Sequence, residues 1–287
     1  MIMNNEPLTV TAVITTYKRE WTSIERAVLS VLNQTYPVAE LLIVDDNHSG
    51  SPFSDSVKRE AEKVPRIRYI SMGGNFGVSA ARNKGMEIAK GILIGFLDDD
   101  DEWLPDKIER QVTVFQKNPD LGLVFGVGRK IDDTTGREKL TWNHEIFKEF
   151  PTFEDELKND HIGSTSHPLI RKDALRAVGG FRIENQPAVE DYELWIRIVK
   201  KYPVQGLNVP LYLKHMDASE HVSRNHRKTF EGYRNIYHLH KDEYKKDRLS
   251  EKQILRNITR EGVKGKMIGV IPYGMRWMML SVLPGKR

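Results

Sequence analysis

Five consecutive acidic residues, Asp98 to Glu102, directly follow the apolar run GILIGFL. Like charges at this spacing repel one another strongly unless a cation compensates them. Asp98 and Asp100 form an Asp-x-Asp pair, and carboxylate oxygens are the ligands that Mg²⁺ and Mn²⁺ prefer. The run therefore indicates a metal site with coordination positions left for phosphate groups. The alternative is a solvated acidic turn at the start of a helix that begins at Pro105.

Two further polar clusters directly follow apolar runs nearer the N-terminus. The segment TTYKRE, residues 15–20, ends the run LTVTAVI, and the segment DDNHSG, residues 45–50, ends the run ELLIV. Three polar clusters thus stand where a predicted strand ends, which is the first indication of function.

These clusters are positioned by a regular alternation of predicted strands and helices. Strand patterns and helix patterns alternate four times, which is typical of βαβ units around a mostly parallel sheet. In such sheets, ligands bind beyond the carboxyl ends of the strands. The fold class is therefore α/β. The strands are predicted at 8–16, 40–46, 67–71 and 91–97, and the helices at 22–36, 55–64, 78–90 and from Pro105. Thr22 and Glu25 have the spacing of a capping box for the first helix.

The alternation of strand and helix patterns becomes less regular after Asp120. A strand is predicted at 121–128, an amphipathic helix within 189–202, and a final pair of strands within 204–215. Glu190 and Asp191 stand at the start of that helix, where acidic residues also favour the helix dipole without any catalytic role.

Charge is distributed unevenly along the 287 residues, although the formal net charge is only +4. From His221 to Arg287 there are 16 Lys and Arg against six Asp and Glu, whereas the first 220 residues are net acidic. A basic tail favours anionic partners such as a membrane surface. The chain has no cysteine, which excludes disulfides, thiolate-bound zinc and a thiol nucleophile. The N-terminus lacks the pattern of a secretory signal, so a cytoplasmic location is expected.

Five motifs in order make the sequence resemble family 2 glycosyltransferases of the GT-A fold, including those that build bacterial surface polysaccharides. They are VITTYKRE, LIVDDNHSG, GNFGVSAARNKG, FLDDDDEWLP, and GGF followed by VEDYELWIR. The resemblance spans roughly residues 8–200 and implies a GT-A domain at 1–220, with a nucleotide-sugar half at 1–120 and an acceptor half at 121–220. Residues 221–287 are then a basic helical extension.

The resemblance implies a set of residues for the nucleotide-diphosphate sugar, with UDP as the expected nucleotide. Asp98 and Asp100 match the family's Asp-x-Asp, which holds Mn²⁺ or Mg²⁺, and Asp98 or Asp99 would hold the ribose. Asp46 matches the acid that hydrogen-bonds the base. The nucleotide-binding turn matches Thr15, Thr16 and Tyr17, with Arg19 close enough to assist.

Three further residues are assigned through the same resemblance. Arg82 matches the family's arginine that faces the diphosphate, although a surface ion pair would also explain it. Asp191 matches the catalytic base of inverting members, which removes the proton of the acceptor hydroxyl, and Glu190 would orient either the acceptor or the metal shell. His215 lies where some relatives place a histidine near the metal, although a lone histidine is more often a packing residue. The SHPLIR segment, with His167 and Arg171, matches a region that lines the acceptor side.

The implied activity is metal-dependent, inverting transfer of a sugar to a hydroxyl of a glycan or a lipid-linked saccharide in surface polysaccharide biosynthesis. A basic and apolar C-terminal segment, 262–287, is expected to lie on a membrane surface rather than cross it, which would place the protein on the inner face of the cytoplasmic membrane. The alternatives for this segment are packing onto the domain or a homodimer contact. A nucleic-acid role lacks any recognisable motif.

Other functions remain open. A phosphatase of the haloacid dehalogenase type also has an apolar strand before Asp-x-Asp, but its motif requires Thr or Val where Glu102 stands. A sugar nucleotidyltransferase would need a glycine-rich loop after the first strand, and TTYKREW has no glycine. The non-enzymatic alternative is a catalytically degenerate sugar-nucleotide-binding or scaffolding protein of the same fold.

Overall fold

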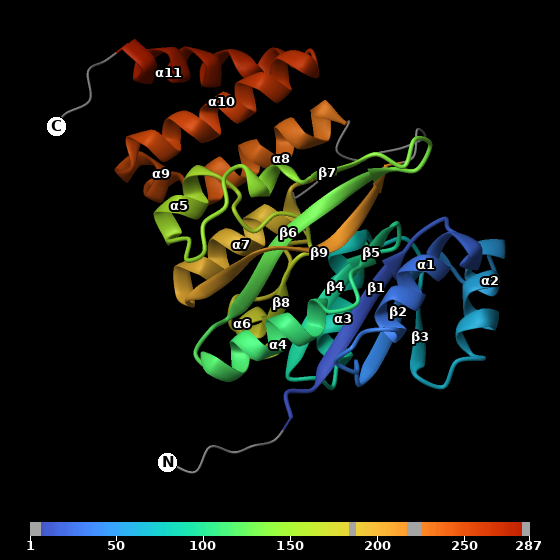
Figure 1. Cartoon of the computed structure of the whole chain (residues 1–287). Helices are drawn as coiled ribbons and strands as arrows, with labels where there is room; N and C mark the ends of the chain where they lie inside the picture. The colour runs from blue at the N-terminus through green and yellow to red at the C-terminus, as the bar shows by residue number, and fades with distance from the viewer. Residues whose placement is uncertain (1–6, 184–187, 217–224, 283–287) are drawn as a thin grey trace.

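The computed structural model describes residues 7–183, 188–216 and 225–282, and it has a mixed α/β architecture built on a nine-stranded sheet (Figure 1). The strand order is β3-β2-β1-β4-β8-β6-β9-β5, and β7 pairs with β6 at the side. The strands are β1 (Val10–Thr16), β2 (Glu40–His48), β3 (Ile67–Gly73), β4 (Leu93–Asp98), β5 (Asp101–Trp103), β6 (Leu123–Asp132), β7 (Glu138–Leu140), β8 (Leu169–Arg171) and β9 (Val204–Met216).

The first half of the chain forms the parallel part of the sheet, as the sequence predicts. Strands β3, β2, β1 and β4 run parallel to one another, and β8 then pairs antiparallel with β4. The connecting helices are α1 (Trp21–Leu32), α2 (Pro52–Ala61), α3 (Val78–Ile88) and α4 (Lys107–Lys117). The alternation of strands and helices predicted for the first half is therefore confirmed.

The central strands are buried on both faces, which explains their continuous apolar sequences. On β1, Ala12 and Ile14 pack in a cluster with α1, α2 and α4, whereas Val13 packs in a second cluster on the other face with α3 and α7 (Glu190–Lys201). A layer of helices therefore covers each face of the sheet.

The second half of the chain adds antiparallel strands and the remaining helices. Strand β6 pairs parallel with β9 and antiparallel with β7 and β8. The other helical segments are η1 (Trp142–His144), α5 (Phe153–Lys158), α6 (Lys172–Ala177), α8 (His226–Leu239), α9 (Lys241–Lys246), α10 (Arg248–Lys264), η3 (Ile268–Val270) and α11 (Ile271–Val282).

Two local predictions are wrong. The predicted final pair of strands is one continuous strand, β9. Its pairing with β6 shifts register near Val127 and then continues to Met216. The capping box does not form, because α1 begins at Trp21 and its N-cap, Glu20, makes no side-chain hydrogen bond. In the acidic run, Asp99 and Asp100 form a turn, and from Asp101 the chain becomes strand β5 and pairs with β9.

The C-terminal helices share a core with the rest of the domain. A third apolar cluster joins α8, α9 and α10 to Leu157 of α5 and to Tyr192 and Ile196 of α7. Helix α7 thus packs against the sheet on one side and against the C-terminal helices on the other, and α11 forms the outermost layer in Figure 1. Within the described residues, none of the helices combines the length and apolar composition needed to cross a bilayer.

Glu193 of α7 is the centre of a buried ion-pair network with Arg182, Arg197 and His240. Its carboxylate is fully buried, accepts hydrogen bonds from Arg182 and Arg197 at 2.7–2.9 Å, and lies 3.4 Å from Nε2 of His240. Burial raises the pKa of Glu193, but His240, Arg197 and Arg182 outweigh burial and lower the pKa to about 2. The ionised carboxylate is therefore bound more favourably in the folded chain than in the unfolded chain.

We expect Glu193→Gln to lower the free energy of unfolding by about 3 kcal/mol at pH 7, because a pKa lowered from 4.5 to about 2 corresponds to that difference. The same contribution should disappear from the wild type as the pH falls from about 4.5 towards 2. Urea unfolding at several pH values measures both effects. The exposed Glu145→Gln variant is the control, and equal losses in the two variants would show that the network contributes nothing.

Candidate active site

The carboxyl ends of the parallel strands bring the predicted polar clusters to one edge of the sheet. The register pairs Thr16 at the end of β1 with Asp45 of β2, and it pairs Thr15 with Asp98 of β4. The side-chain hydroxyl of Thr16 donates a hydrogen bond of 2.7 Å to Asp99. The turn after β1 and the acidic run after β4 therefore contact each other directly.

Arg82 of α3 joins the acidic run to the start of α7. Its guanidinium donates from Nη2 to Oδ1 of Asp98 at 2.8 Å and from Nη1 to Oε1 of Glu190 at 2.7 Å, and the residue is only 4% exposed. Burial disfavours the charge, but Asp98 and Glu190 together raise the pKa of Arg82. Arg82 is thus a buried cation with two carboxylate partners and not a surface ion pair.

Asp98 has additional partners that the sequence did not reveal. The hydroxyl of Thr165 donates to its Oδ1 at 3.2 Å, and its backbone N–H donates to the hydroxyl of Ser166. Burial works against ionisation of Asp98, whereas Arg82 and Lys214 lower its pKa. Asp98 therefore keeps its negative charge at the end of β4.

The negative charge of Asp99 is only partly compensated by neighbouring cations and hydrogen-bond donors. It accepts the hydrogen bond from Thr16, and Nε of Arg19 lies 3.9 Å away. Burial raises its pKa to about 7, and neighbouring Asp100 adds to the shift. Near neutral pH this carboxylate is close to half protonated, so an additional cation would favour its ionised form.

Asp101 has the same excess of negative charge. The residue is 1% exposed, accepts a hydrogen bond of 2.6 Å from Ser166 through Oδ2, and has no partner for its buried Oδ1 in the described part of the chain. Burial raises its pKa to about 8, with Asp98 and Asp100 contributing to the shift. An orphaned buried oxygen beside other carboxylates is typical of a cation-binding site.

Lys214 is a functional candidate that the sequence analysis missed. It stands opposite Asp101 in the β5–β9 pair, so both side chains project from the same face of the sheet. Asp101 is the largest influence on its pKa, which is raised, and Asp98, Asp100 and Asp191 act in the same direction. The segment YLKH contains this lysine, but only the register shows that it faces the acidic run.

The donor set of the acidic run fits Mg²⁺ or Mn²⁺. Asp98 and Asp100 provide hard oxygen ligands, and the Asp100 side chain is 44% exposed with Arg19 as its nearest cation at 3.8 Å. Among the described residues, no three His, Asp or Glu side chains converge into a complete metal shell. This arrangement suits the coordination preference of Mg²⁺, which binds one or two carboxylates and completes its coordination shell with water and substrate phosphates.

Asp191 lies at the first turn of α7 beside Glu190 and is partly buried. Burial raises its pKa well above the usual carboxyl range, Glu190 and Asp160 raise it further, and Arg82 opposes the shift. A carboxylate with a raised pKa is a stronger base than an ordinary one, which suits proton abstraction. Its predicted role is therefore chemically compatible with its environment.

The turn before Asp191 is strained and tightly covered. Val189, the N-cap of α7, has a φ of 55°, a left-handed conformation that a β-branched residue rarely adopts. Gly232 of α8 packs against it, and a Cβ atom at residue 232 would lie 2.7 Å from Cγ2 of Val189 and 2.3 Å from the carbonyl oxygen of Ala188. Helix α8 therefore packs directly against the turn that precedes Glu190 and Asp191.

The remaining predicted nucleotide residues occupy the β1 and β2 ends. Both carboxylate oxygens of Asp46 accept backbone N–H groups, from Phe76 and Gly77 at 2.8 Å, so this residue fixes the glycine-rich turn before α3. Thr15 is buried, and Tyr17 is 39% exposed. The assignment of Asp46 to the nucleotide base stays a prediction, and the structure adds a structural role for it.

His215 has no free ring nitrogen at this site. His215 contacts Asp133 through Nδ1 at 2.6 Å and Glu102 through Nε2 at 3.2 Å, so both ring nitrogens have carboxylate partners. Because side chains alternate along β9, His215 also projects from the face opposite to Lys214. His167 is buried against the Tyr212 ring, and burial lowers its pKa to about 3. The metal role predicted for His215 gains no support from this geometry.

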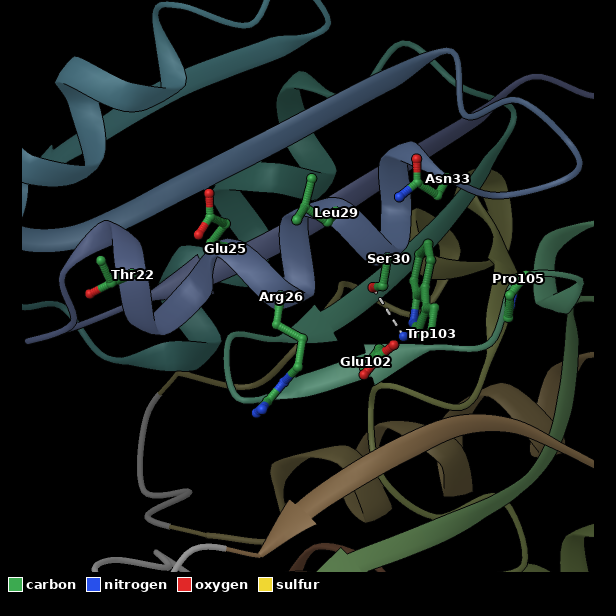
Figure 2. A pocket seen from close by; sticks show the side chains of 9 residues that line it. All are labelled: Thr22, Glu25, Arg26, Leu29, Ser30, Asn33, Glu102, Trp103 and Pro105. Atoms are coloured by element: carbon green, nitrogen blue, oxygen red, sulfur yellow. Dashed lines mark hydrogen bonds between the residues drawn. The ribbon is translucent and has the colours of Figure 1, made fainter. Parts of the chain in front are cut away.

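A cavity of about 440 Å³ lies between α1 and β5, beside the acidic run (Figure 2). Arg26, Glu102 and Trp103 line it, and Arg26 donates a hydrogen bond to the backbone carbonyl of Asp100. None of the predicted site residues lines this cavity. The converging charges of the candidate site therefore lie beside this cavity and not within it.

Comparison with known proteins identifies the family. The profile of the family described as Glycosyl transferase family 2 matches residues 11–179, which include β1, the acidic run and Arg82. The chain belongs to this family and is a glycosyltransferase. The matched range ends before α7, so it leaves out Glu190 and Asp191.

Two relatives cover most of the chain. TuaG of Bacillus subtilis, a glycosyltransferase assigned to teichuronic acid biosynthesis, is 30% identical over 76% of this chain and 84% of its own length. WfgD of Escherichia coli, named a UDP-Glc:alpha-D-GlcNAc-diphosphoundecaprenol beta-1,3-glucosyltransferase, is 31% identical over 69% of this chain and 73% of its own length.

Solved structures support the GT-A fold. The crystal structure of S. aureus TarS 1-349 in complex with UDP-GlcNAc matches with a TM-score of 0.65, over 95% of this chain and 79% of that one, at 15% identity. A longer structure of TarS also matches, and this chain spans 43% of its length. At this identity the likeness concerns the fold, which is the GT-A fold predicted from the sequence.

Proposed function

We propose that the chain is a metal-dependent, inverting glycosyltransferase that moves a sugar from a UDP-sugar to a hydroxyl of a glycan or lipid-linked saccharide in surface polysaccharide biosynthesis. The observation that carries the proposal is the contact of Arg82 with both Asp98 and Glu190. Through this contact, a strand-end acidic run and the helix that carries Asp191 form one site. Residues 1–220 are the proposed catalytic domain, and 221–287 are its extension.

The donor half of the proposed mechanism uses the edge formed by β1, β2 and β4. The turn Thr15–Tyr17 and Asp46 lie at the nucleotide end, Asp98 or Asp99 holds the ribose, and Arg82, Arg19 and Lys214 offer positive charge to the diphosphate. Asp98 and Asp100 are the residues that would hold Mg²⁺ or Mn²⁺. A bound divalent ion would supply Lewis-acid stabilisation of the diphosphate leaving group.

The acceptor half of the proposed mechanism depends on Asp191. A sugar hydroxyl is a weak nucleophile, so a positioned carboxylate removes its proton as the new bond forms. Glu190 is held by Arg82 and remains available only to orient the acceptor. Attack by the hydroxyl from the side opposite to the leaving diphosphate inverts the anomeric centre.

The relatives support the choice of donor and of pathway. WfgD is named for a UDP-glucose donor and a diphosphoundecaprenol-linked acceptor, and TuaG is named for teichuronic acid biosynthesis. One TarS structure is a complex with UDP-GlcNAc and another is a complex with UDP. These names concern the relatives, and they favour UDP and a surface polysaccharide for this chain.

The exposed face of the C-terminal extension favours contact with a membrane. Trp277, Leu280 and Tyr273 pack inward on the third apolar cluster, whereas the opposite face of α11 exposes large apolar side chains. The exposed residues are Ile271, Met275, Met278, Met279 and Val282 of α11, together with Ile268 of η3, each at least 54% exposed. An apolar face near exposed Lys264 and Lys266 suits an anionic lipid surface. Packing and membrane contact thus use different faces of the same helix.

We expect the wild type to bind UDP in a metal-dependent manner and Asp100→Ala to lose about tenfold in affinity with Mn²⁺ or Mg²⁺ present. Calorimetry with a panel of nucleoside diphosphates, in Mn²⁺, Mg²⁺ or EDTA, measures this. The exposed Asp120→Ala variant is the charge-matched control. Binding of another nucleotide would overturn UDP and the Asp46 assignment. The absence of all nucleotide binding would favour the degenerate scaffold.

We expect Asp191→Asn to lower kcat by about 10²–10⁴-fold with unchanged UDP affinity, because the amide cannot remove a proton. Since burial raises the pKa of Asp191, kcat of the wild type should fall as the pH drops through a pKa above the usual carboxyl range. Asp173→Asn, which is exposed, is the control. A variant with full kcat, or a product that retains the donor's anomeric configuration, would contradict the role.

We expect Met275→Ser/Met279→Ser to reduce sedimentation with phosphatidylglycerol vesicles several-fold, because burial of each methionine in lipid contributes about 1.5–3 kcal/mol. Both side chains face outward, so the thermal unfolding midpoint should stay close to that of the wild type. Leu29→Ser/Ile92→Ser, distant from the extension, is the control. Unchanged sedimentation would rule out a membrane contact by this face, and dissociation of a dimer in the variant would identify it as a homodimer contact.

A further inference from the structure

Three lysines stand side by side on adjacent strands next to the acidic run. The register pairs Lys214 of β9 with Lys130 of β6, and it pairs Lys130 with Lys139 of β7. Directly opposite residues project from the same face of a sheet, so the three side chains form a row. At the other end of the row, Lys214 is paired with Asp101. We refer to Lys214, Lys130 and Lys139 as the lysine row.

The lysine row is an unfavourable arrangement without an anion. Like charges placed directly opposite each other destabilise a sheet. Within the described ranges, none of the three ammonium groups has a carboxylate within 4 Å, and Asp132, the nearest acid along β6, accepts the backbone N–H groups of Thr134 and Thr135. Burial lowers the pKa of Lys130, and the charges of Lys214 and Lys139 lower it further.

The opposite face of the same strands is electrically compensated. There, Arg129 pairs with Glu138 at 3.4 Å, and His215 lies between Asp133 and Glu102. Lys130 and Lys139, which have no carboxylate partner among the described residues, therefore lie on the face that carries Asp101 and Lys214. A general excess of lysine in the hairpin of β6 and β7 would not produce this difference between the faces.

The lysine row leads away from the nucleotide end of the site. Neighbouring strands lie about 4.8 Å apart, so Lys139 stands about 14 Å from Asp101 along the row. Strands β9, β6 and β7 continue the sheet on the side remote from β1 and β2 (Figure 1). A diphosphate bound at Asp98 and Asp100 would therefore lie at the Lys214 end of the row, and Lys139 stands at the opposite end.

We propose that Lys130 and Lys139 bind the phosphate or diphosphate group of the acceptor, while Lys214, at the inner end of the row, faces the donor's diphosphate. The acceptor is accordingly a phosphorylated or diphosphate-linked saccharide, and its anionic group lies on the hairpin of β6 and β7 while its hydroxyl lies at Asp191. This inference rests on the proposed function and adds the chemical class of the acceptor. Ammonium groups on adjacent strands match the several oxygens of one diphosphate, and charge-assisted hydrogen bonds of this kind are strong.

The test measures binding of decyl diphosphate to the full chain by calorimetry, in saturating UDP and Mg²⁺ so that the donor site is filled. We expect Lys130→Gln/Lys139→Gln to weaken this binding by about tenfold or more. Lys90→Gln/Lys117→Gln removes the same charge from exposed positions elsewhere and should bind as the wild type does. Decyl maltoside, which has no phosphate, should bind equally to all three proteins.

Each alternative has a distinct outcome. Equal binding of decyl diphosphate to the wild type and the lysine-row variant, or no binding to the wild type, would overturn the inference. A loss of UDP affinity in that variant, with decyl diphosphate unaffected, would assign the row to the donor. If the wild type failed to bind UDP but bound decyl diphosphate through the lysine row, UDP would be excluded as the donor nucleotide. The proposed anion-binding site would still be supported.

Discussion

A buried guanidinium determines how this protein is organised. Arg82 sits between Asp98 and Glu190, and an unpaired charge at such a position would destabilise the fold by several kcal/mol. Its position depends on the close approach of α3 to the sheet. At Gly85, one turn along α3, a Cβ atom would lie 2.4 Å from Cγ1 of Val13. The small residue lets α3 approach β1, and Arg82 then reaches both the end of β4 and the start of α7.

The electrostatics of the site follow from the same arrangement. Arg82 satisfies Asp98 and Glu190, but Asp99 and Asp101 keep raised pKa values because burial outweighs their few polar partners. The site therefore holds more carboxylates than its own cations compensate. A divalent ion would neutralise the acidic residues on one side of the site. The lysine row, on the other side, would attract anions.

Most of the first half could be predicted from the sequence, because both its strands and its helices have strong local patterns. Uninterrupted apolar runs identified the buried strands, and an acidic run that directly follows one of them indicated the candidate site. Contacts set by register could not be predicted in this way. The pairing of Asp101 with Lys214, and the hydroxyls of Thr165 and Ser166 beside Asp98, depend on which strands meet across more than sixty residues. Family resemblance supplied Asp191, and a helix dipole alone would have explained it equally well.

The contact between Gly232 and Val189 links the C-terminal helices to the start of α7 in this chain. The family profile ends at residue 179, yet α8 lies against the backbone that precedes Asp191 and holds a strained valine in place. Replacing the C-terminal helices of this chain would therefore alter the backbone that precedes Glu190 and Asp191 as well as the surface. The extension and the start of α7 thus form one packed unit.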